Sequence, residues 1–116
     1  MGDALVVRFM RYKGSYPAKS YIDEMPERDR ARFLALAKRM ADFGRLPSES
    51  HGHQLRGEFS DLFEFKPGDS RVFAFVHGTS LYLTSGAPKR KSKAQLSDYQ
   101  VALNLRRDFL NREAKK

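Results

Sequence analysis

Hydrophobic positions follow different spacings in successive parts of the chain, and each spacing predicts a kind of element. A short apolar run rich in β-branched residues predicts a strand at 4–10. Two consecutive helices are expected at 16–25 and 26–44, because an early proline in each range can occupy a first helical position and Gly44 provides a stop. One face of the second helix is apolar at helical spacing: Phe33, Leu36, Ala37 and Met40.

The spacing then shortens to about two, the period of a half-buried strand. Short alternating segments predict strands at 53–59, 62–66, 71–77 and 80–85. Turn residues rich in glycine separate the later segments, and short connections between successive strands imply antiparallel pairing. These segments therefore predict an antiparallel meander of three to four strands.

A last helix is expected at 93–113. Ser92 with Gln95, and Ser97 with Gln100, have the spacing of capping boxes near its start. One side of this helix is expected to face a core: Leu96, Tyr99, Leu103 and Leu110. The whole order predicts an α+β fold, made of a strand, a helical hairpin, the meander and a C-terminal helix, with the helices on one face of the sheet. No repeat or linker interrupts residues 1–116, which we expect to form a single domain.

The excess of positive charge favours binding of a polyanion. The chain carries 22 Lys and Arg against 14 Asp and Glu, a net charge of +8, and no acidic residue occurs within 70–97. Such a surface attracts nucleic acid, although many small proteins are basic for solubility alone. The chain has no cysteine, its N-terminal apolar run is too short for a signal peptide, and no run approaches a membrane span. We therefore expect a soluble cytoplasmic protein.

Four of the five cations within 70–97 lie in "SGAPKRKSK", residues 85–93, between the last predicted strand and the last predicted helix. A segment anchored at both ends is not a disordered tail, which leaves a solvated turn or a phosphate site. Helix N-termini also attract phosphate. We expect Lys89, Arg90 and Lys91 to face a phosphate together with Arg71, and Lys93 to remain a solvated charge at the helix start.

The predicted sheet holds a second set of chemical groups. Period two places Glu64 and Lys66 on one strand face, opposite Phe63 and Phe65, and Arg71 follows across a short turn. The two cations are expected either to surround a phosphodiester or to form a surface ladder of cross-strand ion pairs with Glu64.

Histidines supply the remaining candidates. His51 and His53 form an H-x-H pair, but the chain has no cysteine and no evident third ligand, so no metal site and no cofactor are predicted. His53 is the candidate general base, since imidazole titrates near neutrality, and an exposed loop histidine without a role is the alternative. His77 is expected to be exposed in a turn.

Four short motifs occur in order along the chain: "HQLRG", "LFEFK", "SRVFAF" and "LTSGAPKRK". In this order and spacing the chain resembles the RelE/ParE superfamily of toxins from type II toxin–antitoxin pairs, within it the HigB-like, phage Gp49-like branch. Three positions depart from the family pattern: His53 stands where lysine or glutamate is common, Phe63 where tryptophan is usual, and Ala87 where phenylalanine is usual.

The resemblance implies an endoribonuclease, an mRNA interferase that acts with the ribosome, arrests translation and uses no metal or cofactor. The resemblance implies roles for Lys66, Arg71, Lys89, Arg90, Lys91 and Tyr99. With our own assignments added, the expected catalytic residues are His53, Lys66, Arg71, Lys89, Arg90 and Lys91, and the expected RNA-binding residues are Arg56, Glu64, Lys93 and Tyr99. The implied partners are a cognate antitoxin, expected to be a small helix-turn-helix protein, together with mRNA and the ribosome, and no membrane.

Two other functions fit the same pattern. A ParE-like protein shares the fold but inhibits DNA gyrase without catalysis, and a prophage accessory protein would only bind nucleic acid. Converging cations favour the nuclease, because a phosphorane needs them and a gyrase inhibitor does not.

Overall fold

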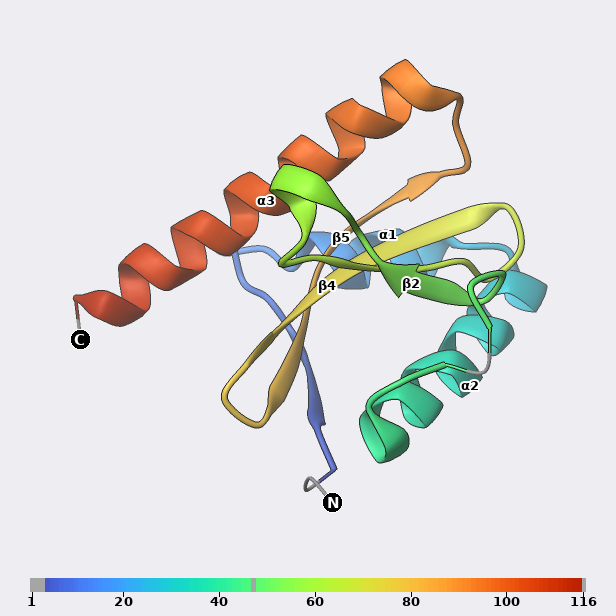
Figure 1. Cartoon of the computed structure of the whole chain (residues 1–116), viewed down its shortest axis with the longest axis horizontal. Coiled ribbons are helices and arrows are strands. Elements are labelled where there is room, and N and C mark those ends of the chain that lie inside the picture. Colours follow the sequence, from blue (N-terminus) through green and yellow to red (C-terminus); the bar gives the residue numbers. More distant parts are fainter. Residues whose placement is uncertain (1–3, 47, 116) are drawn as a thin grey trace.

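A mixed sheet organises the protein. Over residues 4–46 and 48–115, which the computed structural model describes, the sheet has five strands in the order β1-β5-β4-β3-β2. The strands are β1 (Val6–Phe9), β2 (Gly52–Gln54), β3 (Phe63–Phe65), β4 (Ser70–His77) and β5 (Ser80–Pro88). The helices are α1 (Pro17–Glu24), α2 (Glu27–Phe43), the short 3-10 helix η1 (Gly57–Phe59) and α3 (Ser92–Ala114). The α+β order predicted from the sequence is confirmed (Figure 1).

Pairing in the sheet follows the predicted meander, with one addition. Strands β2, β3, β4 and β5 pair antiparallel with their neighbours in chain order. Strand β1 pairs parallel with β5, and the α1–α2 hairpin carries the chain from β1 to β2 at the opposite edge of the sheet. The first strand thus closes one edge of the sheet, and β2 forms the other.

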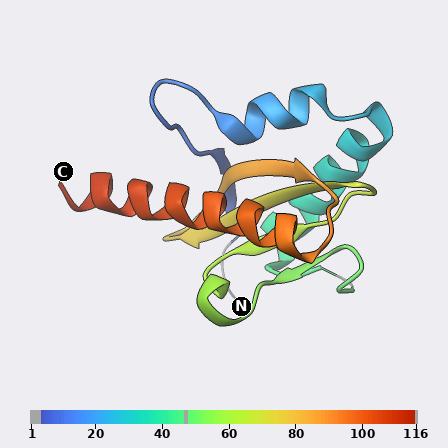
Figure 2. The ribbon, with the colours of Figure 1, turned by 90° about the horizontal axis from the view of Figure 1, so that it is seen from above.

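The helices cover both faces of the sheet, so the expectation that they pack on one face is wrong. Helices α1 and α2 pack on one face, and α3 lies across the opposite face (Figure 2). Strand β4 shows the reason. Val72 and Ala74 belong to the core under α1 and α2, whereas Phe73 and Phe75 belong to the core under α3. A strand that is apolar on both sides needs two covering layers to remove both sides from water.

Helix α2 matches its predicted pattern. Its predicted apolar stripe is buried in full: Phe33, Leu36, Ala37 and Met40. Gly44 ends the helix in the left-handed region with φ 72°, and its N–H donates to the carbonyl of Met40. Glycine adopts this conformation without the steric cost that a β-carbon brings.

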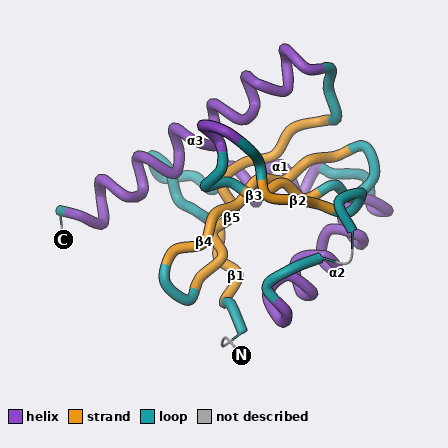
Figure 3. The backbone as a smooth tube through the Cα atoms, in the orientation of Figure 1, coloured by secondary structure: helices purple, strands orange, loops and turns teal. Residues whose placement is uncertain are grey.

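Helix α3 departs from its predicted pattern. Leu96, expected in the core, is 53% exposed, and the buried residues are Ala102 and Leu105. The middle of α3 crosses the sheet while its two ends project beyond it, so only the middle positions reach the core (Figure 3). The expected capping boxes are also absent, because Lys91 is the N-cap residue and no side chain caps the helix start.

Two strands, β2 and β5, differ most from their expected ranges. Strand β2 is shorter, because the second half of the predicted strand 53–59 forms η1. Strand β5 is longer and runs through Pro88, which pairs with Ser70. The first part of the basic segment is therefore sheet, and only the residues from Lys89 to Lys91 form the connection to α3.

Packing of α1 against β5 yields a stability prediction. A β-carbon added at Gly86 would lie 2.2 Å from Cδ2 of Tyr21, a distance that real structures do not show. Gly86→Ala should lower the free energy of unfolding in urea by about 1–3 kcal/mol, the usual cost of overpacking. The same substitution in a Tyr21→Ala background should cost much less. Equal costs in the two backgrounds would show that the clash with Tyr21 is not the cause.

Candidate functional site

A buried carboxylate lies at the centre of the sheet face that α3 covers. Glu64 is the middle residue of β3, its side chain is fully buried, and its strand neighbours are His53 and Phe73. Phe63 and Phe65 point to the opposite core, as period two predicted. The alternative of a surface ion-pair ladder is wrong, because a side chain with no exposed area is not part of a surface.

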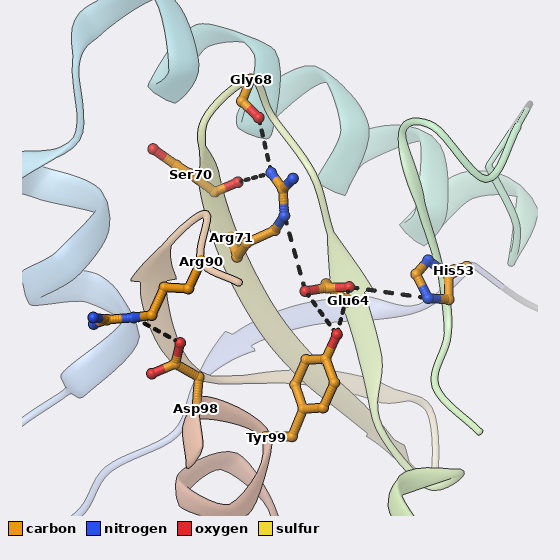
Figure 4. Close-up of polar contacts among 8 residues, drawn as sticks. All are labelled: His53, Glu64, Gly68, Ser70, Arg71, Arg90, Asp98 and Tyr99. Carbon is orange, nitrogen blue, oxygen red and sulfur yellow. Dashed lines mark hydrogen bonds and ion pairs between the residues drawn. The ribbon is translucent and has the colours of Figure 1, made fainter. Parts of the chain in front are cut away.

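Three side chains from three other elements converge on Glu64 (Figure 4). Arg71 Nε lies 3.9 Å from Oε2, and His53 Nε2 lies 3.9 Å from Oε1. The Tyr99 hydroxyl donates to both carboxylate oxygens, at 3.3 and 3.5 Å. We call these four residues the Glu64 cluster. A buried carboxylate is tolerated only where donors and positive charge replace water, and the cluster supplies both.

Arg71 is held by the turn that precedes its strand. Its Nη1 donates to the carbonyls of Gly68 and Ser70, each at 2.8 Å, and its side chain is only 11% exposed (Figure 4). Nη2 makes no hydrogen bond to any residue that the structure describes. The guanidinium is therefore fixed on one side and retains donors on the other, which suits it to bind an anion.

The turn itself is fixed against α2 by a residue that the sequence analysis did not single out as functional. Ser70 Oγ donates to Asp29 Oδ2 at 2.8 Å, and both side chains are buried. Gly68 has φ 75°, and a β-carbon there would lie 2.3 Å from Asp29 Oδ1. Asp29 thus orients the turn whose carbonyls orient Arg71. The presence of Asp29 in the first turn of α2 was the only sequence signal, and it also fits a simple charge–dipole contact.

Burial changes the proton affinity of two members of the cluster. Burial and the neighbouring Glu64 carboxylate raise the pKa of Tyr99 to about 12, so the phenol remains protonated and donates to Glu64. Burial and the charge of Lys66 lower the pKa of His53, while Glu64 opposes them. The imidazole is therefore neutral near pH 7, the form that can accept a proton.

Cations of the basic segment diverge instead of meeting Arg71 as a group. The backbone N–H of Lys89 donates to the carbonyl of Asp69, which places this residue beside the turn that holds Arg71. Arg90 turns away and forms an ion pair with Asp98 at 2.9 Å (Figure 4). Lys91 and Lys93 are exposed at the start of α3. The expectation that Arg90 faces the same point as Arg71 is wrong, because Asp98 on α3 binds its guanidinium.

Other predicted residues lie around the cluster. Lys66 directly follows β3, is half-buried, and acts on His53 through its charge. Arg56 is exposed and lies 3.7 Å from Glu49. The Tyr99 ring packs edge-on against Phe59 and Phe73, so its contacts are those of a core residue as well as of a site residue.

Within residues 4–46 and 48–115, no group of three His, Asp or Glu side chains is placed to hold a metal ion. In the same ranges no helix is long and apolar enough to cross a membrane.

Comparisons with known proteins give one family and one fold. The family described as phage derived protein Gp49-like (DUF891) matches residues 20–107, which include the whole Glu64 cluster. No curated protein sequence matches the chain.

The solved structures that are similar to this chain include two complexes. The archaeal RelE–RelB complex from Pyrococcus horikoshii OT3 aligns with TM-score 0.54 at 18% identity, covering 79% of this chain and 100% of that chain. The toxin–antitoxin complex RelBE2 from Mycobacterium tuberculosis aligns with TM-score 0.44 at 24% identity, covering 75% and 99%. The first match shows that the chain has a RelE-like fold.

The electrostatics of the cluster can be tested by NMR. Because the charge of Lys66 lowers the pKa of His53, Lys66→Met should raise that pKa toward 6.5, and Glu64→Gln should lower it further. Titration of the His53 ring signals, assigned by their loss in His53→Gln, measures both shifts. Shifts of the same sign in the two variants would contradict the described arrangement.

Proposed function

The chain belongs to the family of phage-derived Gp49-like proteins (DUF891), and on that premise we propose that it is the toxin of a toxin–antitoxin pair and an endoribonuclease. The observation that carries the proposal is the Glu64 cluster, in which one buried carboxylate lies beside a neutral histidine and a fixed arginine. The RelE-like fold supports the toxin assignment, because the similar archaeal RelE is found in complex with RelB. The proposed partners are an antitoxin, mRNA and the ribosome, and the proposed location is the cytoplasm.

In the proposed reaction the RNA supplies its own nucleophile. His53 Nε2 takes the proton of a ribose 2′-hydroxyl, and the 2′-oxygen forms a bond to the adjacent phosphorus. The bond from phosphorus to the 5′-oxygen breaks, and that oxygen leaves with a proton from a neighbouring acid or from water. The products are a 2′,3′-cyclic phosphate and a 5′-hydroxyl end. DNA is not a substrate because it lacks the attacking hydroxyl.

Glu64 supports this reaction through its neighbours His53 and Arg71. When His53 accepts a proton, the imidazolium that forms has the carboxylate 3.9 Å from Nε2, which stabilises the new charge. The same carboxylate holds Arg71 by attraction, and Tyr99 fixes the carboxylate by donating to it. In this role Glu64 and Tyr99 act as positioning residues instead of binding RNA directly.

Cations bind the phosphate in two groups. Arg71 and Lys66, which flank the 67–69 turn, act on the phosphorane charge, and Lys89 beside the same turn assists the leaving oxygen. Arg56, Lys91 and Lys93 are exposed and hold the RNA strand. Arg90 could join them only by leaving Asp98, so we assign it to ordering the start of α3.

Substitution of Arg71 tests the phosphate role. Arg71→Lys keeps a positive charge but loses the planar guanidinium, in which Nη1 binds two carbonyls while Nε faces Glu64, so the cleavage rate should fall by about 10²-fold or more while growth arrest is lost. Arg71→Ala should abolish cleavage, but it leaves Glu64 buried without its cation, so circular dichroism must confirm the fold. Arg28→Lys, at an exposed position of α2, is the matched control.

Mapping of RNA ends after induction distinguishes the outcomes. Cleaved mRNA with cyclic phosphate ends supports the proposal. A folded Arg71→Ala protein that still cleaves would remove Arg71 from the mechanism, and DNA damage with intact mRNA would point to gyrase inhibition instead.

The pH dependence of cleavage tests the general base. Only neutral His53 accepts a proton, so kcat/KM should fall as pH drops through the pKa of His53, which burial and Lys66 place below 6.5. His53→Gln should lower the rate by about 10²- to 10⁴-fold and remove that acid limb. A variant that keeps both the rate and the limb would show that another group is the base.

A further inference from the structure

A cleft beside the candidate site has the lining of a nucleotide subsite. It has a volume of about 570 Å³ and lies between α2, the segment that contains Ser50 and His51, and the turn from Lys66 to Gly68. Its apolar lining comes from Ala35, Leu36 and Pro67, and its basic lining comes from Arg32, His51 and Lys66. Apolar surface suits a base and cations suit a phosphate, so the two kinds of lining match the two parts of a nucleotide.

The cations of the cleft are available for a ligand. Among the residues that the structure describes, no acidic side chain lines the cleft, and the side chains of Arg32 and Lys66 make no hydrogen bond or ion pair. Ser48 Oγ lies 3.0 Å from His51 Nδ1, which leaves Nε2 of that ring for another contact. The carboxylate of Asp29 lies close to Gly68, but it is buried, accepts from Ser70 and does not line the cleft.

The cleft and the Glu64 cluster share one short turn, from Lys66 to Gly68. Lys66 lines the cleft, and its charge also lowers the pKa of His53, so it lies close to both. Gly68 lines the cleft as well, and its carbonyl holds Arg71. The same turn therefore borders both sites, so an RNA strand bound across this turn would contact both.

We propose that this cleft binds the nucleotide next to the scissile phosphate on the same RNA strand, with Arg32 on that nucleotide's own phosphate, Lys66 between the two phosphates, and the base against Ala35 and Leu36. The inference rests on the proposed RNA cleavage and adds a subsite to it. Arg32 then contributes to binding RNA and not to the chemical step, because it lies outside the Glu64 cluster.

Binding of RNA in which every ribose carries a 2′-O-methyl group tests the subsite without cleavage. Oligonucleotides of graded length, from a dinucleotide upward, are titrated at several salt concentrations and followed by fluorescence anisotropy. Wild-type affinity should rise at the length that first fills the cleft. Arg32→Gln should remove that rise, lower the affinity for longer oligonucleotides about fivefold, the size of one exposed ion pair, and reduce the salt slope by about 0.7. Arg28→Gln, at an exposed position of the same helix and outside the cleft, is the matched control.

The results separate the subsite from the proposed function. Equal losses of RNA affinity in the Arg32→Gln and Arg28→Gln variants would show only a diffuse basic field and would overturn the subsite. Unchanged RNA affinity in Arg32→Gln would overturn it as well. With cleavable RNA, Arg32→Gln should raise KM and leave kcat unchanged. Length-dependent binding by a protein that cleaves no RNA would retain the subsite as an RNA-binding cleft and refute the nuclease.

Discussion

The free-energy cost of burying a carboxylate determines which groups must surround Glu64. Glu64 has no exposed area, and an isolated charge in such a place costs more than a domain of this size can tolerate. The carboxylate is therefore surrounded by Arg71, His53 and Tyr99, each from a different element. Removing Arg71 leaves the carboxylate without its cation, and removing Tyr99 leaves it without its hydroxyl donor, so the fold and the site depend on each other.

The layers of the protein make that burial possible. Strand β4 is apolar on both sides, which draws α1 and α2 to one face and α3 to the other. Because α3 crosses the face that carries Glu64, it brings Tyr99 over the carboxylate and closes it from water. The opposite face contributes as well, because Asp29 of α2 fixes the turn that holds Arg71. Both cores thus orient the same arginine.

The sequence predicted what depends on local periodicity. The order of elements, the buried stripe of α2, and the placement of Glu64 opposite Phe63 and Phe65 follow from spacing within single segments. The contact between Asp29 and Ser70 joins residues 41 positions apart, and spacing within either segment carries no trace of it. Leu96 has the correct helical phase but is 53% exposed near the start of α3, and spacing within the helix does not determine which of its turns lie over the sheet. Arg90 looked equivalent to its neighbours until Asp98 on the next helix was placed beside it.

The positive charges of the chain divide into fixed and exposed groups, and in the proposed reaction the two groups act on different steps. Arg71 is held by two carbonyls and a carboxylate, so it needs no reorganisation when charge develops on a phosphate, and such preorganised groups lower barriers. Lys91 and Lys93 are solvated and unrestrained, so they attract a polyanion over a distance of about 8 Å at physiological salt and raise its local concentration. Net charge alone therefore says little about catalysis in this protein. The proposed nuclease depends mainly on Arg71, the cation that the fold holds beside the buried carboxylate of Glu64.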